Sequence, residues 1–366
     1  MSLKTAFTNT NALSFSKWLF LRDDKLKSIV FFFISGKNAT SPRFFPLFNE
    51  TQNTRIVYFR GPNLPYLDKL WLKSFVICYK LTKRKVKRYE ILHLFSLEMS
   101  IGLNFEYYHL DDPTYSDREI NKLNDWAEAM EKKGAVGSII CTCTFVENWL
   151  RTVNVKFKTI IIEQGFSSID IEEGIKKNEK FSYVYSSPYI HYGRDKHGNH
   201  STWGAGNLID FIIPGILGSL PGAQIHLVGD VGRCAKKTLS KLDSVVMHGR
   251  VDQITNQRIL RSCHVGLYPR KHDHKRSVQK IYEYLGANLP VVTYDLTDTE
   301  VIKTNHLGFA VVNESEFLKA SYALYINSDL YLTYAKRIED FKQPYSWKVL
   351  AEKMEKKVNV CFPRNS

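Results

Sequence analysis

Positively charged side chains gather before and at the start of a short predicted helix, and one carboxylate lies inside that helix. Lys275, Arg276 and Lys280 place cations where the helix dipole already favours an anion. Glu283 is the single carboxylate of the helix, one turn beyond Lys280. Cations at a helix start can neutralise a diphosphate, and a carboxylate one turn later can accept hydrogen bonds from a ribose. The stretch therefore predicts a site for a nucleoside diphosphate.

A second polar group lies at the end of a strand that we predict over 104–110: His109 is within the strand, and Asp111 and Asp112 follow it. An imidazole or carboxylate at this place could position an acceptor hydroxyl or a sugar during catalysis. The same residues could instead cap a turn or helix, since Asp112 precedes Pro113. Both interpretations stay open, and the first makes these three the candidate catalytic residues.

The positive cluster must be held by the segment 280–292, which reads as a helix, a tight turn and a buried strand. Ile281 and Leu285 lie on one apolar side at helical spacing. Ser277 is predicted to cap the helix start by accepting from exposed backbone N–H groups. β-branched and aromatic residues over 291–294 favour a strand.

Strand-like and helix-like segments alternate through the whole chain. Strands are predicted at 28–34, 55–59, 89–95, 104–110, 137–144, 158–165, 181–192, 224–229, 244–249, 263–269, 291–294 and 308–312. Such alternation predicts an α/β fold with parallel sheets that carry helices on both faces. The polar, lysine-rich stretch over 167–180 is the best linker candidate. A chain of 366 residues is too long for one ordinary core, so we expect two domains.

The charge balance favours anionic partners, because the formal net charge is +14. Phosphorylated substrates, anionic lipid surfaces and nucleic acid all fit this charge, but no recognised nucleic-acid motif is present and we expect no nucleic-acid partner. A helix predicted over 65–88 has a strongly basic end. It either packs on the core with a solvated end or rests an amphipathic face on an anionic membrane.

The six cysteines form no C-x-x-C pair, so we expect free thiols in a reducing cytoplasm rather than a disulfide framework. No run of about 18 apolar residues and no signal-peptide pattern occurs, which favours a cytoplasmic protein with peripheral contact at the inner face of the membrane. His272, Asp273 and His274 share one loop without a spaced fourth ligand. We therefore expect no metal site and no cofactor.

Several motifs of the second half occur in a fixed order. They are the strand Ile225–Gly229, His248–Val251, Cys263–Pro269, the segment Lys280–Val292, Gly308–Val311 and Ser346-Trp347. This order resembles the donor-binding domain of GT-B glycosyltransferases, specifically the large retaining family 4. The resemblance covers 181–350, and the first half agrees more loosely, through 162–165 and 109–112.

The resemblance implies two Rossmann-like domains that face each other across a cleft. It implies an acceptor-side domain over 1–170, a nucleotide-sugar domain over 181–340, and a final helix over 341–366 that crosses back to the first domain. The donor-binding roles that it carries onto this chain are a ribose contact from Glu283, backbone beside the base at Gly249, Arg250 and Val251, and pyrophosphate contacts from Arg194, Lys196 and Lys280.

The chain departs from the family at the position eight residues before Glu283, where a second glutamate is common and Lys275 stands here. The missing contact to the donor sugar would then come from another group, such as Asp273. We expect a hexosyltransferase that moves a sugar from a nucleotide diphosphate sugar to a lipid-linked or polysaccharide acceptor. The resemblance implies retention of configuration, and fixed cations stabilise a departing diphosphate without a metal. The alternatives are a degenerate, non-catalytic GT-B protein that binds a nucleotide or partner, and a nucleic-acid-binding α/β protein.

Overall fold

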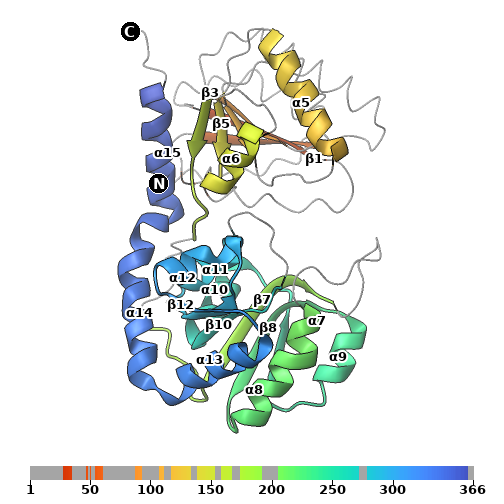
Figure 1. Cartoon of the computed structure of the whole chain (residues 1–366), viewed down its shortest axis with the longest axis vertical. Coiled ribbons are helices and arrows are strands. Elements are labelled where there is room, and N and C mark those ends of the chain that lie inside the picture. The colour runs from red at the N-terminus through yellow and green to blue at the C-terminus, as the bar shows by residue number, and fades with distance from the viewer. Residues whose placement is uncertain are drawn as a thin grey trace. The chain divides into compact units, whose positions relative to one another are not determined.

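The chain folds into two compact units (Figure 1). Unit 1 comprises Met1–Glu163 and Trp347–Ser366, and unit 2 comprises Gln164–Ser346. The computed structural model describes residues 28–34, 47, 50, 54–60, 87–92, 107–110, 117–132, 138–152, 158–166, 174–191, 205–271 and 278–361. Both units are built on parallel sheets, so the predicted α/β fold is confirmed.

Unit 1 contains a six-stranded parallel sheet in the order β2-β1-β3-β4-β5-β6. Its strands are β1 (Ser28–Ile34), β2 (Thr54–Arg60), β3 (Lys87–Leu92), β4 (Tyr107–Leu110), β5 (Ser138–Cys141) and β6 (Lys158–Ile161). The described helices are α5 (Asp117–Lys132), α6 (Thr144–Thr152) and α15 (Trp347–Cys361). Continuous apolar runs such as Ile29–Phe33 suit strands that helices cover on both faces.

The core of unit 1 includes an aromatic contact between β4 and α5. The rings of Tyr108 and Trp126 meet edge to face, with centroids 5.1 Å apart, and both side chains are buried. The Tyr108 hydroxyl lies 3.9 Å from the sulfur of Met130, one turn further along α5. This contact fixes the α5 face that covers β4.

The final helix, α15, belongs to unit 1, although α14 before it belongs to unit 2. Its buried residues recur at helical spacing: Trp347, Leu350, Ala351 and Met354. Lys353 Nζ forms an ion pair with Glu163 at 2.7 Å, and Lys357 Nζ donates to the carbonyl of Ile161 at 3.0 Å. The chain therefore returns to unit 1 at Trp347.

Unit 2 contains a six-stranded parallel sheet in the order β12-β11-β10-β7-β8-β9. Its strands are β7 (Ser182–Ile190), β8 (Gln224–Val231), β9 (Val245–Gly249), β10 (Val265–Tyr268), β11 (Val291–Tyr294) and β12 (Gly308–Val311). Counted along the unit, this is the 3-2-1-4-5-6 order of dinucleotide-binding domains. The order reverses between β7 and β10, and ligands bind beyond the carboxyl ends of strands at such a switch point.

Helices cover both faces of this sheet. They are α7 (Ala205–Asn207), the π-helix η1 (Leu208–Ile212), α8 (Ile213–Ser219), α9 (Arg233–Leu239), α10 (Gln253–Ser262), α11 (Gln279–Gly286), the 3₁₀ turn η2 (Thr297–Thr299), α12 (Glu300–Thr304), α13 (Glu314–Ile326), α14 (Ser328–Lys342) and the 3₁₀ turn η3 (Gln343–Tyr345). One apolar cluster joins the sheet to η1, α8, α9 and α13, and a second joins it to α10, α11, α12 and α14.

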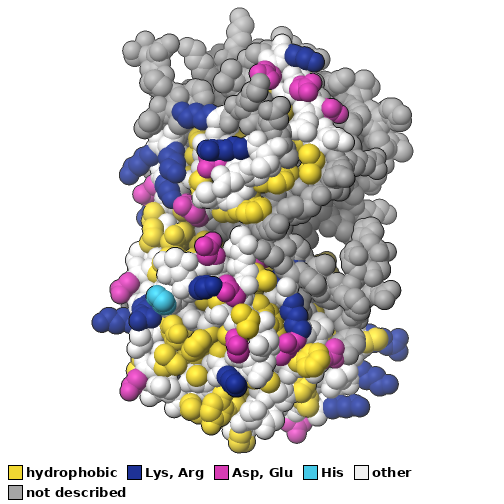
Figure 2. All heavy atoms as spheres, viewed as in Figure 1, with side chains coloured by type: hydrophobic (Ala, Val, Ile, Leu, Met, Phe, Trp, Pro, Cys, Tyr) yellow, Lys and Arg dark blue, Asp and Glu magenta, His cyan; other side chains and the backbone are white. Residues whose placement is uncertain are grey.

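The outer side of the α8 and α13 layer mixes residue types. Figure 2 shows hydrophobic side chains there among acidic and basic ones. Phe211 on η1 is 56% exposed, and Tyr322 and Ile326 on α13 are 45% and 59% exposed. These side chains are not members of the two apolar clusters of the unit.

The predicted helix, turn and strand over 280–292 are present as α11 and β11. Ile281 and Leu285 are buried, as their spacing predicts. The helix ends at a turn in which Asn288 adopts a left-handed φ of 62°. The helix α11 starts at Gln279 and its N-cap position is Val278, one residue later than the predicted cap; Ser277 itself lies outside the described residues.

The stretch predicted as a linker is attached to unit 2 from Gly174 onward. The backbone N–H of Asn178 donates to the carbonyl of Ser262 at 2.8 Å, and Lys177 Nζ donates to the carbonyl of Cys263 at 2.5 Å. Burial lowers the pKa of the Lys177 ammonium to about 8. The polar residues of this stretch therefore hold it against unit 2 by hydrogen bonds.

Histidines form a hydrogen-bonded network against the same segment. The amide of Asn178 lies 3.4 Å from Nε2 of His226, whose Nδ1 lies 3.0 Å from Nε2 of His248. The backbone N–H of Ser182 donates to Nδ1 of His264 at 3.1 Å. Burial, with the neighbouring charged or ionisable groups, lowers the pKa of both His226 and His264 to about 4. Both rings are therefore neutral near pH 7.

Candidate functional site

The two strands at the switch point of unit 2 pair only briefly, through Val184 and Gly266 and the residues just before them. Beyond this pair, a tyrosine hydroxyl replaces the backbone hydrogen bonds that would otherwise join the two strands. Tyr284 Oη accepts from the backbone N–H of Ser186 at 3.0 Å and donates to the carbonyl of Leu267 at 3.2 Å. This tyrosine, on α11, therefore clamps β7 to β10 where the strands separate.

The sequence makes room for the clamp by placing a glycine under the ring. A Cβ on Gly266 would lie 2.6 Å from the ring of Tyr284. Burial raises the pKa of the Tyr284 hydroxyl well above its usual value, so the hydroxyl stays protonated and can donate. The glycine in the motif Cys263–Pro269 thus has a packing role at the switch point.

Lys280 lies in the first turn of α11 and is held by aromatic rings from both switch-point strands. Its ammonium is 4.2 Å from the ring centroid of Tyr185 on β7 and 5.8 Å from that of Tyr268 on β10. Both rings are buried, and burial raises the pKa of Tyr185, so this phenol is neutral. The contact is therefore a cation–π interaction rather than an ion pair.

Glu283 lies one turn after Lys280, on the same helix, and is half-buried. Its Oε1 accepts from the side-chain amide of Gln279 at 3.1 Å. A carboxylate can accept several hydrogen bonds, and the contact with Gln279 helps to orient the Glu283 side chain. The carboxylate that is predicted to contact the ribose is therefore oriented by a residue of its own helix.

Gly249 is the last residue of β9, as the sequence predicts, and Arg250 and Val251 follow it. Gly249 has a left-handed φ of 68°, which turns the chain from β9 toward α10. Arg250 places its guanidinium 5.2 Å from the ring centroid of Tyr189 on β7, and Val251 packs against the core beneath α10 and α11.

The carboxyl ends of β10 and β11 are tied to the helix that follows β7. The side-chain amide of Asn207 donates to the carbonyl of Pro269 at 3.2 Å and to the hydroxyl of Tyr294 at 2.8 Å. This fixes the end of α7 against the ends of both strands.

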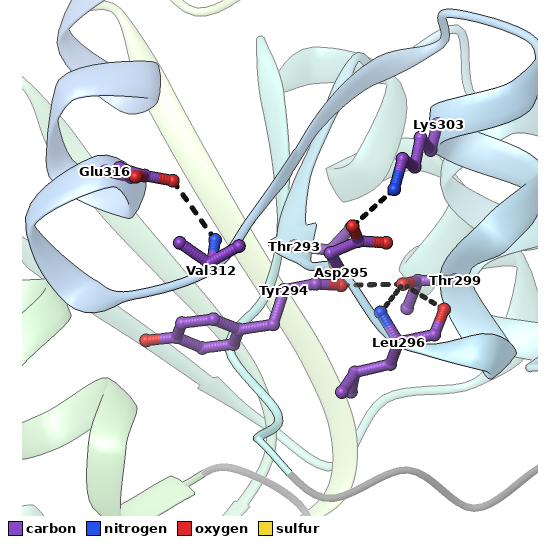
Figure 3. A network of polar contacts seen from close by, with 8 residues as sticks. All are labelled: Thr293, Tyr294, Asp295, Leu296, Thr299, Lys303, Val312 and Glu316. Atoms are coloured by element: carbon purple, nitrogen blue, oxygen red, sulfur yellow. Dashed lines mark hydrogen bonds and ion pairs between the residues drawn. The ribbon is translucent and has the colours of Figure 1, made fainter.

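Turns close the ends of β11 and β12, as Figure 3 shows. Thr299 donates through Oγ1 to the carbonyl of Tyr294 at 2.6 Å, and Lys303 pairs with Asp295 at 2.5 Å. Next to them, the backbone N–H of Val312 donates to Glu316 at 3.1 Å. These polar groups therefore satisfy one another at the ends of β11 and β12.

Seven predicted site residues receive no side-chain description. Asp111, Asp112, Arg194, Lys196, Asp273 and Lys275 lie outside the described residues. The backbone of His109 pairs with Ile91 of β3 and Ile140 of β5, in the middle of the unit 1 sheet. Of the predicted residues of unit 2, the structure describes Lys280 and Glu283 on α11, and Gly249, Arg250 and Val251 at the end of β9.

Sequence reasoning missed the tyrosines that support the site. Tyr185, Tyr268 and Tyr284 are all buried at the switch point, where they hold Lys280 and join two strands. A tyrosine inside a predicted buried strand or on an apolar helix face is a usable signal, because its hydroxyl requires a partner there.

Within the described ranges, no three His, Cys, Asp or Glu side chains are placed to hold a metal ion. The described cysteines, Cys141, Cys143, Cys234 and Cys263, are free thiols. Among the helices built from described residues, none combines the length and apolar character needed to cross a bilayer.

By sequence, no family model matches the chain and no curated protein matches it. Solved structures do match its fold. HepE from Anabaena, in complex with UDP and glucose, gives a TM-score of 0.66 at 12% identity, covering 91% of this chain and 100% of that one. WaaG, a glycosyltransferase involved in lipopolysaccharide biosynthesis, gives 0.63 at 11% identity, covering 91% and 100%.

Sucrose-phosphate synthase from Thermosynechococcus elongatus gives a TM-score of 0.61 at 12% identity, covering 92% of this chain and 99% of that one. These matches extend over nearly the whole of each chain and include both α/β units. The chain therefore has the GT-B fold, built from two Rossmann-like units, that these solved structures share.

Proposed function

We propose that the chain is a glycosyltransferase that moves a sugar from a nucleotide diphosphate sugar to an acceptor. The observation that carries this proposal is the arrangement at the switch point of unit 2. There, α11 starts beside Tyr185 of β7 and the last residue of β10, with Lys280 fixed over two tyrosine rings and Glu283 one turn later. A switch point, a helix start, a cation and a carboxylate together suit a nucleoside diphosphate.

In this proposal the diphosphate binds at the start of α11. The N-cap residue of that helix is Val278, whose apolar side chain cannot accept a hydrogen bond, so a phosphate oxygen can accept from the first backbone N–H groups of the helix. Lys280 supplies a positive charge in the same turn, and Arg194, Lys196 and Lys275 are the further cations that the sequence offers. Asp273 remains the candidate contact to the donor sugar.

Glu283 binds the ribose in this proposal. Its carboxylate accepts from the ribose hydroxyls, and Gln279 keeps it oriented. The backbone at Gly249, Arg250 and Val251 lies beside the base. The HepE structure, which contains UDP and glucose, supports a nucleotide-binding use of the shared fold.

The reaction needs stabilisation of the departing diphosphate above all, because negative charge collects on it as the glycosidic bond breaks. A fixed ammonium and helix-start N–H groups supply this without a metal ion. His109, Asp111 and Asp112 of unit 1 are the groups that would position the acceptor. Retention of configuration follows from the resemblance to family 4.

The acceptor in this proposal is lipid-linked or a polysaccharide precursor. The net charge of +14 suits an acceptor carried on an anionic membrane surface, with the protein in peripheral contact at the cytoplasmic side. Vesicle flotation with and without anionic lipid tests this part separately from catalysis.

Thermal unfolding with nucleotide sugars tests the core of the proposal. A ligand that binds only the folded state stabilises it by about 2.7 kcal/mol at a hundred times its Kd. We expect UDP-, GDP- or dTDP-linked sugars to raise Tm, and the wild-type chain to release the nucleoside diphosphate from one of them when the acceptor is present.

Two other outcomes would favour the alternatives. Nucleotide binding without any turnover, over a full panel of sugars and acceptors, would identify a degenerate member of the fold. Strongly salt-dependent binding to oligonucleotides, with no binding of any nucleotide sugar, would identify a nucleic-acid-binding protein instead.

A further inference from the structure

Three exposed side chains stand together at the carboxyl ends of β7, β8 and β9. Tyr189 is next to last on β7, Asp230 is next to last on β8, and Arg250 follows the last residue of β9. The diphosphate and ribose contacts of the proposed function use none of these side chains. They lie at the same edge of the sheet as the start of α11.

The three side chains lie on one face of that edge. Tyr189 and Asp230 are register partners in adjacent parallel strands, so their side chains project from the same face. The residues after them, Ile190 and Val231, pack into the opposite layer with α8 and α13. Tyr189 and Asp230 therefore project on the α10 and α11 side, and the guanidinium of Arg250 is 5.2 Å from the Tyr189 ring.

This group offers two adjacent hydrogen-bond donors, on the guanidinium of Arg250, and two adjacent acceptors, on the carboxylate of Asp230. In the part of the chain that the structure describes, Asp230 makes no hydrogen bond or ion pair, and Arg250 is paired with no carboxylate. A guanidinium donates two parallel hydrogen bonds, and a carboxylate accepts two. Arg250 and Asp230 carry opposite charges at the predicted base site and do not pair with each other. They therefore suit a ligand that presents hydrogen-bond acceptors on one edge and hydrogen-bond donors on another.

We propose that the nucleotide of this site is a guanosine diphosphate, read by Arg250 and Asp230. This rests on the proposed function, since it names the base of the same donor. Guanine presents O6 and N7 as adjacent acceptors, which match a guanidinium. It also presents N1–H and the N2 amino group as adjacent donors, which match a carboxylate.

Other bases satisfy only part of this pair. Adenine places a donor beside N7, so it cannot accept both hydrogen bonds of a guanidinium there. Uracil has one N–H between two carbonyl groups, so a carboxylate that accepts from this N–H faces two other acceptors. Among guanine, adenine and uracil, only guanine can hydrogen-bond in this way to both the guanidinium and the carboxylate.

Tyr189 acts through Arg250 as a positioning residue. Its ring stacks on His191 at a centroid distance of 5.5 Å, which holds the ring in place beneath the guanidinium. A cation–π contact needs the aromatic face and not the hydroxyl. The Tyr189→Phe variant should therefore keep the affinity for GDP, whereas Tyr189→Leu should weaken it.

Isothermal titration of the full chain with GDP, IDP, UDP and ADP tests the proposal. IDP lacks only the N2 amino group of guanine. We expect GDP to bind about 10- to 100-fold more tightly than UDP or ADP, and more tightly than IDP. The Asp230→Asn variant should weaken GDP and shrink the difference between GDP and IDP, while leaving UDP unchanged.

Matched controls lie away from the site. Asp243→Asn changes another exposed aspartate, and Arg337→Gln removes another arginine that lies over a tyrosine ring, 5.9 Å from Tyr334. Neither should alter the preference, whereas Arg250→Gln should reduce it. Tighter binding of UDP or ADP than GDP, or equal binding of GDP and IDP, overturns the guanine assignment but leaves the proposed function standing. Binding of none of the four overturns the guanine assignment, and it contradicts the proposed function as well if UDP-, GDP- and dTDP-linked sugars also fail to raise Tm.

Discussion

Removing one hydroxyl from the switch point of unit 2 should cost far more stability than its size suggests. Tyr284→Phe deletes the group that accepts from the N–H of Ser186 and donates to the carbonyl of Leu267. The short pairing of β7 with β10 ends at Val184 and Gly266, so no ladder hydrogen bond replaces it. The phenyl ring still fills the buried space, so the effect isolates the two hydrogen bonds.

The magnitude follows from the two backbone groups left behind. A buried donor or acceptor without a partner costs about 1–3 kcal/mol. The carbonyl loses less than the N–H because it has a second lone pair, so the total is about 2–4 kcal/mol. For a unit as long as Gln164–Ser346, about 1 kcal/mol lowers Tm by about 2–4 °C, which predicts a fall of about 4–16 °C.

Differential scanning calorimetry of the whole chain measures this effect. Tyr325→Phe is the matched control, since its hydroxyl makes one long contact of 3.4 Å with the carbonyl of Pro221 at the surface. It should lower Tm by no more than about 2 °C. If Tyr284→Phe melts no lower than Tyr325→Phe, the hydroxyl is not the clamp between β7 and β10.

Other outcomes follow from the same packing and charges. Gly266→Ala places a Cβ 2.6 Å from the Tyr284 ring, so calorimetry should show that the free energy of unfolding falls by about 1–3 kcal/mol. An unchanged Tm would contradict the packing role of this glycine. Gly229→Ala adds strain at a φ of 137° and a Cβ 1.6 Å from a β7 carbonyl, so it should give little folded protein; a wild-type yield and Tm would contradict this. His226 and His264 have pKa values near 4 when folded against 6.5 as the ordinary value, so the unfolded chain binds the extra protons as pH falls. Their contribution to stability is therefore full above about pH 6.5 and lost toward about pH 4, and urea midpoints that stay level between about pH 6.5 and 5 would contradict it.

Periodicity and residue type were enough to predict the α/β fold, because buried parallel strands are continuous apolar runs that alternate with amphipathic helices. They also located α11, whose buried residues recur at helical spacing and whose turn ends at Asn288. The helix start was harder, since the predicted cap at Ser277 depended on a boundary that lies at Gln279. Boundaries shift by a residue or two because end turns gain little from periodic burial.

The candidate site could be predicted only in part from the sequence, because it is formed by residues that are far apart along the chain. Lys280 and Glu283 stood out since charge and spacing lie within one short segment. The ring of Tyr185 meets Lys280 only because β7 and β10 are neighbours in the sheet, and Asp230 meets Tyr189 only through strand register. Local patterns carry no information about such pairs, so these residues became visible only in the structure.

The central claim is that α11 binds a nucleoside diphosphate, and titration of nucleotide sugars into the wild-type chain and the Glu283→Ala variant tests it most directly. Hydrogen bonds to a charged group contribute about 1.5–3 kcal/mol, so Glu283→Ala should raise Kd by about tenfold or more. The control Glu352→Ala changes an exposed glutamate on α15 and should leave Kd unchanged. A chain that binds no nucleotide sugar, or a Glu283→Ala variant with unchanged Kd, would contradict the account.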